Sequence, residues 1–126
     1  MKEQIASQGA PAAIGPYSQA IRWKELIFVS GQLALNEHSG QVDGGIREQT
    51  HGVLSNLTNI LKDSGSGLDC VLKTTVFLSD MSDFADMNDV YSSFFKMDPP
   101  ARSTIQVAKL PKEAKVEIEA IAFVRK

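Results

Sequence analysis

The chain has one cysteine among its 126 residues, so it cannot form an internal disulfide. Cys70 precedes an apolar, β-branched segment, and we expect it to be a small buried side chain and not a reactive thiol. His38 and His51, the two histidines, have no acidic or thiol companions at the spacing of metal ligands. The sequence therefore predicts no metal site.

A strong excess of charge is also missing. The formal net charge is -2, and the 13 Lys and Arg residues are spread along the chain, which gives no footprint for a nucleic acid. No apolar run approaches the ~18 residues of a membrane-spanning helix, and residues 1–15 lack the apolar stretch of a secretion signal. We therefore expect a cytoplasmic protein with no nucleic-acid or membrane partner.

The length favours one domain over residues 1–126, near the size at which contacts between subunits often complete the core. Apolar residues recur every three or four positions over residues 46–63, which predicts a helix that Gly65 ends. A second helix should begin near Ser82 and Asp83 and end before Pro99.

Residues 18–22 and 26–30 should form a hairpin, residues 68–78 a central strand, and residues 33–35 fit either a strand or a loop. Residues 1–13 are small and polar, and we expect an irregular arm there.

Residues 99–122 alternate with period two on both sides of a polar break that contains Pro111. This pattern predicts two adjacent strands joined by a turn. Val116 and Ile118 start the core-facing side of the last strand, while Glu117 and Glu119 share its other side with apolar residues.

The order of elements predicts an α+β fold with a mixed sheet and both helices packed on one face. Two helices cover one face only, yet the last strand carries apolar residues on both. A second copy of the chain covering the other face would explain this pattern.

Several polar residues could belong to a binding site. Arg102 begins a strand after a proline pair, where its planar fork could bind a carboxylate, but it could equally be a surface charge or part of a structural ion pair. Glu117 or Glu119 could be partly desolvated or simply solvated. Asn88 lies on an apolar helix stripe and could tie down backbone or face a pocket.

Two residues near the N-terminus leave similar alternatives. Tyr17 follows a Gly-Pro pair and could be an aromatic that packs at an edge or one that lines a pocket. Gly31 allows a close approach to the backbone, either by a neighbouring strand or bulge or by a ligand.

The run at residues 100–122, PARSTIQVAKLPKEAKVEIEAIA, resembles the signature of the RidA family, the reactive intermediate deaminases formerly called YjgF. The resemblance extends to APAAIGPYSQA at 10–20, VSGQ at 29–32 and KTTVFLSDMSDFADMNDVY at 73–91. It implies a chorismate-mutase-like fold and a homotrimer with three pockets at the subunit interfaces. It also implies cofactor-free hydrolysis of 2-imino acids, such as 2-iminobutanoate and 2-iminopropanoate, to 2-oxo acids and ammonia.

The same resemblance suggests roles for individual residues. Arg102 would bind the substrate carboxylate, helped by backbone N–H groups of Gly31 and Thr104, and Glu117 would activate the attacking water. Many members have cysteine where this chain has Thr104, so substrate preference could differ. The residues that would shape the pocket are Tyr17, Ser30 and Asn88.

Two other classes of function stay open. A regulatory protein could bind a small carboxylate through the same arginine without turnover, but it would not need Glu117 as a base. Some relatives have been linked to nuclease activity, for which basic clusters or a metal site would be expected.

Overall fold

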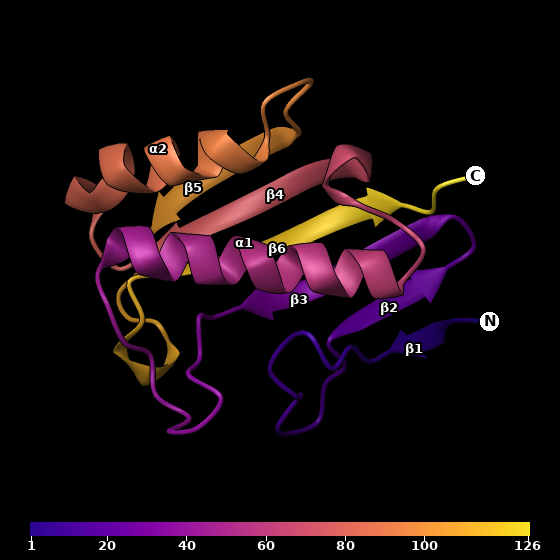
Figure 1. Cartoon of the computed structure of the whole chain (residues 1–126), viewed down its shortest axis with the longest axis horizontal. Helices are drawn as coiled ribbons and strands as arrows, with labels where there is room; N and C mark the ends of the chain where they lie inside the picture. The colour runs from indigo at the N-terminus through magenta and orange to yellow at the C-terminus, as the bar shows by residue number, and fades with distance from the viewer.

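The computed structural model describes all residues of the chain, 1–126, as one six-stranded sheet with both helices on the same face (Figure 1). The elements are β1 (Glu3–Ile5), β2 (Ala20–Trp23), β3 (Leu26–Gln32), α1 (Ile46–Asp63), β4 (Val71–Leu78), α2 (Phe84–Phe94), β5 (Ala101–Gln106) and β6 (Val116–Phe123). The strand order is β1-β2-β3-β6-β4-β5, and only β4 and β5 pair in parallel. The predicted α+β class, with a mixed sheet and both helices on one face, is confirmed.

Helix α1 has the predicted bounds because its sequence carries both the apolar period and the end signals. Its buried apolar residues are Ile46, Val53, Leu54, Leu57, Ile60 and Leu61. At the start, the Gly45 N–H donates to the Glu48 carboxylate at 3.0 Å, which satisfies one of the free donors of the first turn. At the end, Gly65 adopts φ +80°, a conformation that favours glycine.

Helix α2 begins slightly later than the sequence indicates. A 3₁₀ turn, Met81–Asp83, precedes it, and the Asp80 carboxylate accepts from the Ser82 N–H at 2.9 Å. Neither Ser82 nor Asp83 caps the helix through its side chain, because the chain is already turning at Asp80. The helix connects β4 to β5 and therefore allows these two strands to pair in parallel.

The last two strands are not neighbours, so the prediction of a terminal hairpin is wrong. β4 lies between β5 and β6, and β6 pairs antiparallel with both β3 and β4. Alternation along a strand shows which side chains share a face, but it does not show which strand lies alongside. The apolar residues on the second face of β6 stay partly exposed, because no part of the chain packs over that face.

The structure corrects two further expectations and decides between two alternatives at residues 33–35. Residues 3–5 form the edge strand β1 where an irregular arm was expected, because they pair with β2. Residues 33–35 form no strand, since Leu35 makes only an isolated bridge to Val42. The fourth strand begins at Val71, after a 3₁₀ turn that contains Cys70, which is 2% exposed and buried as expected.

The hydrophobic core lies between the sheet and the two helices, and the opposite face of the sheet has no cover in the chain (Figure 1). Three large apolar side chains on this open face, Phe28, Ile105 and Phe123, are 42%, 45% and 39% exposed. Both helices lack the combination of length and hydropathy that crossing a lipid bilayer requires.

Candidate active site

Glu117 lies on the open face of the sheet, directly above Gly31. The neighbouring residues of β6, Val116 and Ile118, are fully buried under the helices, so Glu117 points the other way. A Cβ atom at Gly31 would overlap the Oε2 atom of Glu117. The close approach allowed by this glycine is therefore made by the carboxylate side chain of the adjacent strand.

A β-bulge brings β3 into this position. Val29 pairs with Ala120 and Gln32 with Ile118, so Ser30 and Gly31 together lie opposite one residue of β6. The Ser30 hydroxyl donates to the Ser18 carbonyl at 2.6 Å and holds the bulge against the preceding loop. Sequence periodicity does not reveal such an extra residue.

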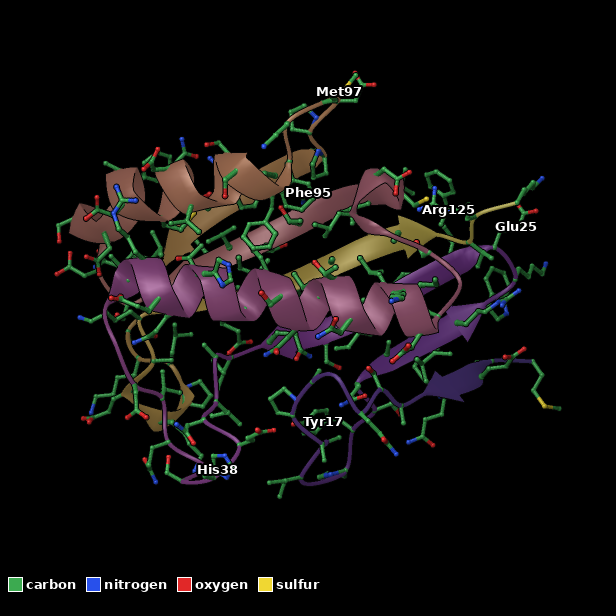
Figure 2. All side chains as sticks on the ribbon, viewed as in Figure 1. Tyr17, Glu25, His38, Phe95, Met97 and Arg125 are labelled. Carbon is green, nitrogen blue, oxygen red and sulfur yellow. The ribbon has the colours of Figure 1, made fainter.

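An open cleft of about 690 Å³ adjoins the bulge. Four residues proposed from the sequence, Tyr17, Ser30, Gly31 and Glu117, line it together. Tyr17 is 53% exposed and lies on the loop before β2. In the view of Figure 2 it is on the other side of α1 from Phe95, the residue at the end of α2. The other lining residues are Ala12, Ile14, Leu33, Leu35, Pro111, Lys112 and Glu119.

Lys112 is a residue of this cleft that sequence reasoning missed. It belongs to a 3₁₀ turn, Pro111–Glu113, in which Lys112 and Glu113 both adopt positive φ, at 57° and 55°. Two consecutive non-glycine residues in the left-handed region are strained, a feature that is common near functional sites. The proline predicted a turn here, but nothing in the sequence showed that the turn reaches the cleft.

The environment of Glu117 makes its carboxyl group a weaker acid than usual. Burial raises the pKa of Glu117, and the negative charge of Glu119 raises it further. Glu117 takes part in none of the chain's five ion pairs. A carboxylate with a raised pKa in a cleft is suited to accept a proton from water.

Arg102 lies on the opposite face of the sheet, against α2. It pairs with Thr74, whose side chain is fully buried under the helices. The Arg102 Nη1 atom donates to Asn88 Oδ1 at 2.8 Å, and the guanidinium carbon lies 4.7 Å from the Tyr91 ring centroid. The guanidinium is also 5.6 Å from the ring of Phe84. No carboxylate pairs with it.

Thr104 shares this helix-covered face with Arg102, since it pairs with the buried Val76. Its Oγ1 atom is the one buried side-chain polar atom of the chain without a hydrogen-bond partner. The structure therefore brings Asn88, Arg102 and Thr104 together on one side of the sheet.

The seven candidate residues thus form two groups on opposite faces. Glu117 and Arg102 do not meet within one chain, because their side chains leave the sheet in opposite directions and β4 separates their strands. We call Tyr17, Ser30, Gly31 and Glu117 the acid half-site, and Asn88, Arg102 and Thr104 the arginine half-site.

Comparison with known proteins identifies the family. Residues 7–124 match the family model described as Endoribonuclease L-PSP. The chain belongs to the Endoribonuclease L-PSP family. Among curated members, Reactive Intermediate Deaminase A, chloroplastic, of Arabidopsis thaliana is 48% identical over 96% of this chain and 65% of its own length.

Two other relatives of the Endoribonuclease L-PSP family are similar over almost the whole chain. The 2-iminobutanoate/2-iminopropanoate deaminase of Mus musculus is 48% identical over 97% of this chain and 91% of its own. The crystal structure of E. coli TdcF with bound serine has a TM-score of 0.92 and 40% identity, covering 98% of this chain and 99% of that one. The resemblance to the RidA family found in the sequence is thereby confirmed.

Proposed function

We propose that the protein is a hydrolytic deaminase that converts 2-imino acids and their enamines, including 2-iminobutanoate and 2-iminopropanoate, to 2-oxo acids and ammonia. Relatives 48% identical to this chain carry the names of this activity. The observation that carries the proposal in the chain itself is Glu117, a carboxylate with a raised pKa that faces a cleft and has no cation as partner.

The reaction needs a base and a binding site for a carboxylate. Glu117 takes a proton from water as the water oxygen attacks the imine carbon, and it passes that proton to the imine nitrogen to give the carbinolamine. Glu117 then moves the hydroxyl proton of the carbinolamine to the nitrogen as the C–N bond breaks, which releases ammonia and leaves the 2-oxo acid. Arg102 binds the substrate carboxylate through its planar fork, with the backbone N–H groups of Gly31 and Thr104 as further donors. No cofactor takes part in these steps.

The two half-sites lie on opposite faces of one sheet, so a complete site needs two copies of the chain. We propose a homotrimer in which the arginine half-site of one copy meets the acid half-site of the next at each subunit interface. The position of Arg102 on the edge strand β5 supports this arrangement. So do the exposed apolar residues of the open face, which a second copy would cover.

The polar partners observed in the chain refine the roles of Ser30 and Asn88. The Ser30 hydroxyl already donates to backbone, and the Asn88 carbonyl oxygen accepts from Arg102. Both therefore shape the half-sites through other protein groups, while Tyr17, which the chain leaves half-exposed, can contact the substrate. The cytoplasmic location and the single domain over residues 1–126 remain predictions.

The family description names an endoribonuclease, but the site favours the deaminase. An arginine without a carboxylate partner suits a small carboxylate, whereas a nuclease needs a basic surface for the phosphate backbone. The chain has a net charge of -2. Turnover also separates the enzyme from a regulatory protein that only binds carboxylates.

The decisive experiment is a coupled assay. A pyridoxal-phosphate dehydratase generates the imine in situ, and the release of ammonia and 2-oxo acid is followed with and without the purified protein. We expect faster release that scales with protein concentration, and a mass by light scattering of about three times the 13.7 kDa of one chain. Unchanged release with tight binding of 2-oxobutanoate would support the regulatory protein instead.

A further inference from the structure

Arg102 is a half-buried cation that the chain orients without a negative charge. An arginine in such a position usually pairs with a carboxylate, because burial without a partner is costly. Here its neighbours on α2 are two aromatic rings and one amide, at the distances given above. Phe84, Asn88 and Tyr91 follow each other at spacings of four and three residues, so they lie on one face of the helix.

Tyr91 is the most firmly held member of this group. Its hydroxyl shares a 2.8 Å hydrogen bond with the Thr74 hydroxyl, and Thr74 is fully buried on β4. Its ring packs on Phe95 with 4.7 Å between ring centroids, and the residue is 5% exposed. Phe95 lies at the end of α2 (Figure 2). The ring therefore presents a fixed face to the guanidinium.

We propose that Tyr91, with Phe84 and Asn88, is a positioning residue that holds the Arg102 guanidinium through neutral contacts and so keeps its whole charge available for the substrate. This inference rests on the proposed binding of a substrate carboxylate by Arg102. It assigns Tyr91 a part in the reaction that the sequence did not suggest, and it makes Asn88 a residue that acts through Arg102.

The physical reason lies in what each kind of contact does to the charge. A carboxylate beside Arg102 would orient it, but it would also neutralise the field that attracts the substrate and would occupy donors of the fork. The face of an aromatic ring attracts the cation through its quadrupole without neutralising its charge. The amide oxygen of Asn88 occupies one of the five N–H donors of the Arg102 guanidinium.

The first test compares substitutions of Tyr91. Tyr91→Leu removes the ring and is expected to raise KM for the imine and Kd for 2-oxobutanoate about tenfold, with a much smaller change in kcat. Tyr91→Phe keeps the ring and loses only the hydroxyl, so it should restore most of the lost affinity. A matched control is Phe94→Leu on the same helix, whose ring contacts His51 and not Arg102.

The control should leave both constants within about twofold of the wild type, since Phe94 has no contact with the site. If Tyr91→Leu, Tyr91→Phe and Phe94→Leu all behave alike in a folded protein, the inference is overturned. Should Tyr91→Leu fail to fold, Asn88→Asp provides an independent test, because the two side chains have nearly the same size.

Asn88→Asp keeps the contact to Arg102 and adds the charge that the native site avoids. We expect the thermal stability to be equal or higher and the affinity for 2-oxobutanoate to fall at least tenfold. A purely structural Asn88 predicts unchanged affinity, and that result would overturn the inference.

Activity of the wild type separates this inference from the proposed function. If the wild type neither releases ammonia from the imine nor binds 2-oxobutanoate, the proposed function fails. If the wild type does both and the Asn88→Asp and Tyr91→Leu variants match it, only the role of Tyr91 and Asn88 fails.

Discussion

The two half-sites differ in how the fold prepares them. Arg102 lies on the covered face of the sheet, where helix α2 holds its guanidinium with an amide and two rings. Glu117 lies on the open face, where it packs against Gly31 and faces a cleft without a charged partner. The comparison shows that the two faces of one sheet can supply two different environments, one that holds a cation in place and one that raises the pKa of a carboxyl group.

The largest effect on turnover is expected when the base, Glu117, is replaced. Glu117→Gln keeps the size of the side chain but cannot accept a proton, so turnover should fall about a hundredfold or more. Affinity for 2-oxobutanoate should stay the same or rise slightly, because a nearby negative charge is removed. Turnover and affinity are both measured on the same folded variant. Full turnover would contradict the role of Glu117 as base, and loss of both would indicate a structural role.

A change in the binding group should cost less. Arg102→Lys keeps the charge and loses the planar fork, which removes a charge-assisted hydrogen bond worth roughly 1.5–3 kcal/mol. Catalytic efficiency should therefore fall on the order of ten- to a hundredfold in a folded protein. Steady-state kinetics together with circular dichroism measure both properties. Unchanged efficiency would exclude Arg102 as the carboxylate-binding group.

Mixing the two variants tests whether the half-sites come from different chains. When Arg102→Lys and Glu117→Gln chains are unfolded and refolded together, about a quarter of the interfaces should combine an intact arginine with an intact glutamate. Activity should then recover to roughly a quarter of the wild-type value. Each variant refolded alone is the control. Absence of recovery in a mixed oligomer would mean that one chain supplies both groups.

The smallest expected effect concerns stability and pH. The pKa of Glu117 is raised within the single folded chain, so the charged carboxylate destabilises the fold of that chain at pH values above the raised pKa. This destabilisation disappears as the pH falls below the pKa of the unfolded chain, because the group is then protonated in both states. Glu117→Gln lacks it at every pH.

Thermal unfolding of the wild type and Glu117→Gln should therefore differ by a few degrees at most near pH 8, with the variant higher, and the two curves should converge towards pH 4. A difference that grows on acidification would contradict the raised pKa. The size of the difference also shows how strongly the cleft desolvates the Glu117 carboxylate compared with the same group in the unfolded chain.

Local features of the fold were readable from the sequence because they depend on near neighbours in the chain. The period of three and four, with Gly65 after it, predicted both ends of α1. Alternation along residues 116–124 predicted which side chains of β6 enter the core, and the position of Glu117 on the other face followed from it. The stripe of Phe84, Asn88 and Tyr91 on α2 was likewise visible as a spacing.

The sequence by itself thus determined the helices, the faces of the strands and, through its motifs, the seven candidate residues. Only the tertiary structure decided that β4 separates β5 from β6, that a bulge brings Gly31 under Glu117, and that Tyr91 lies against Arg102. The physical reason is that periodicity records which side of an element meets the core. Which strand lies alongside another, and which side chains then meet across the core, depend on contacts between residues far apart in the chain.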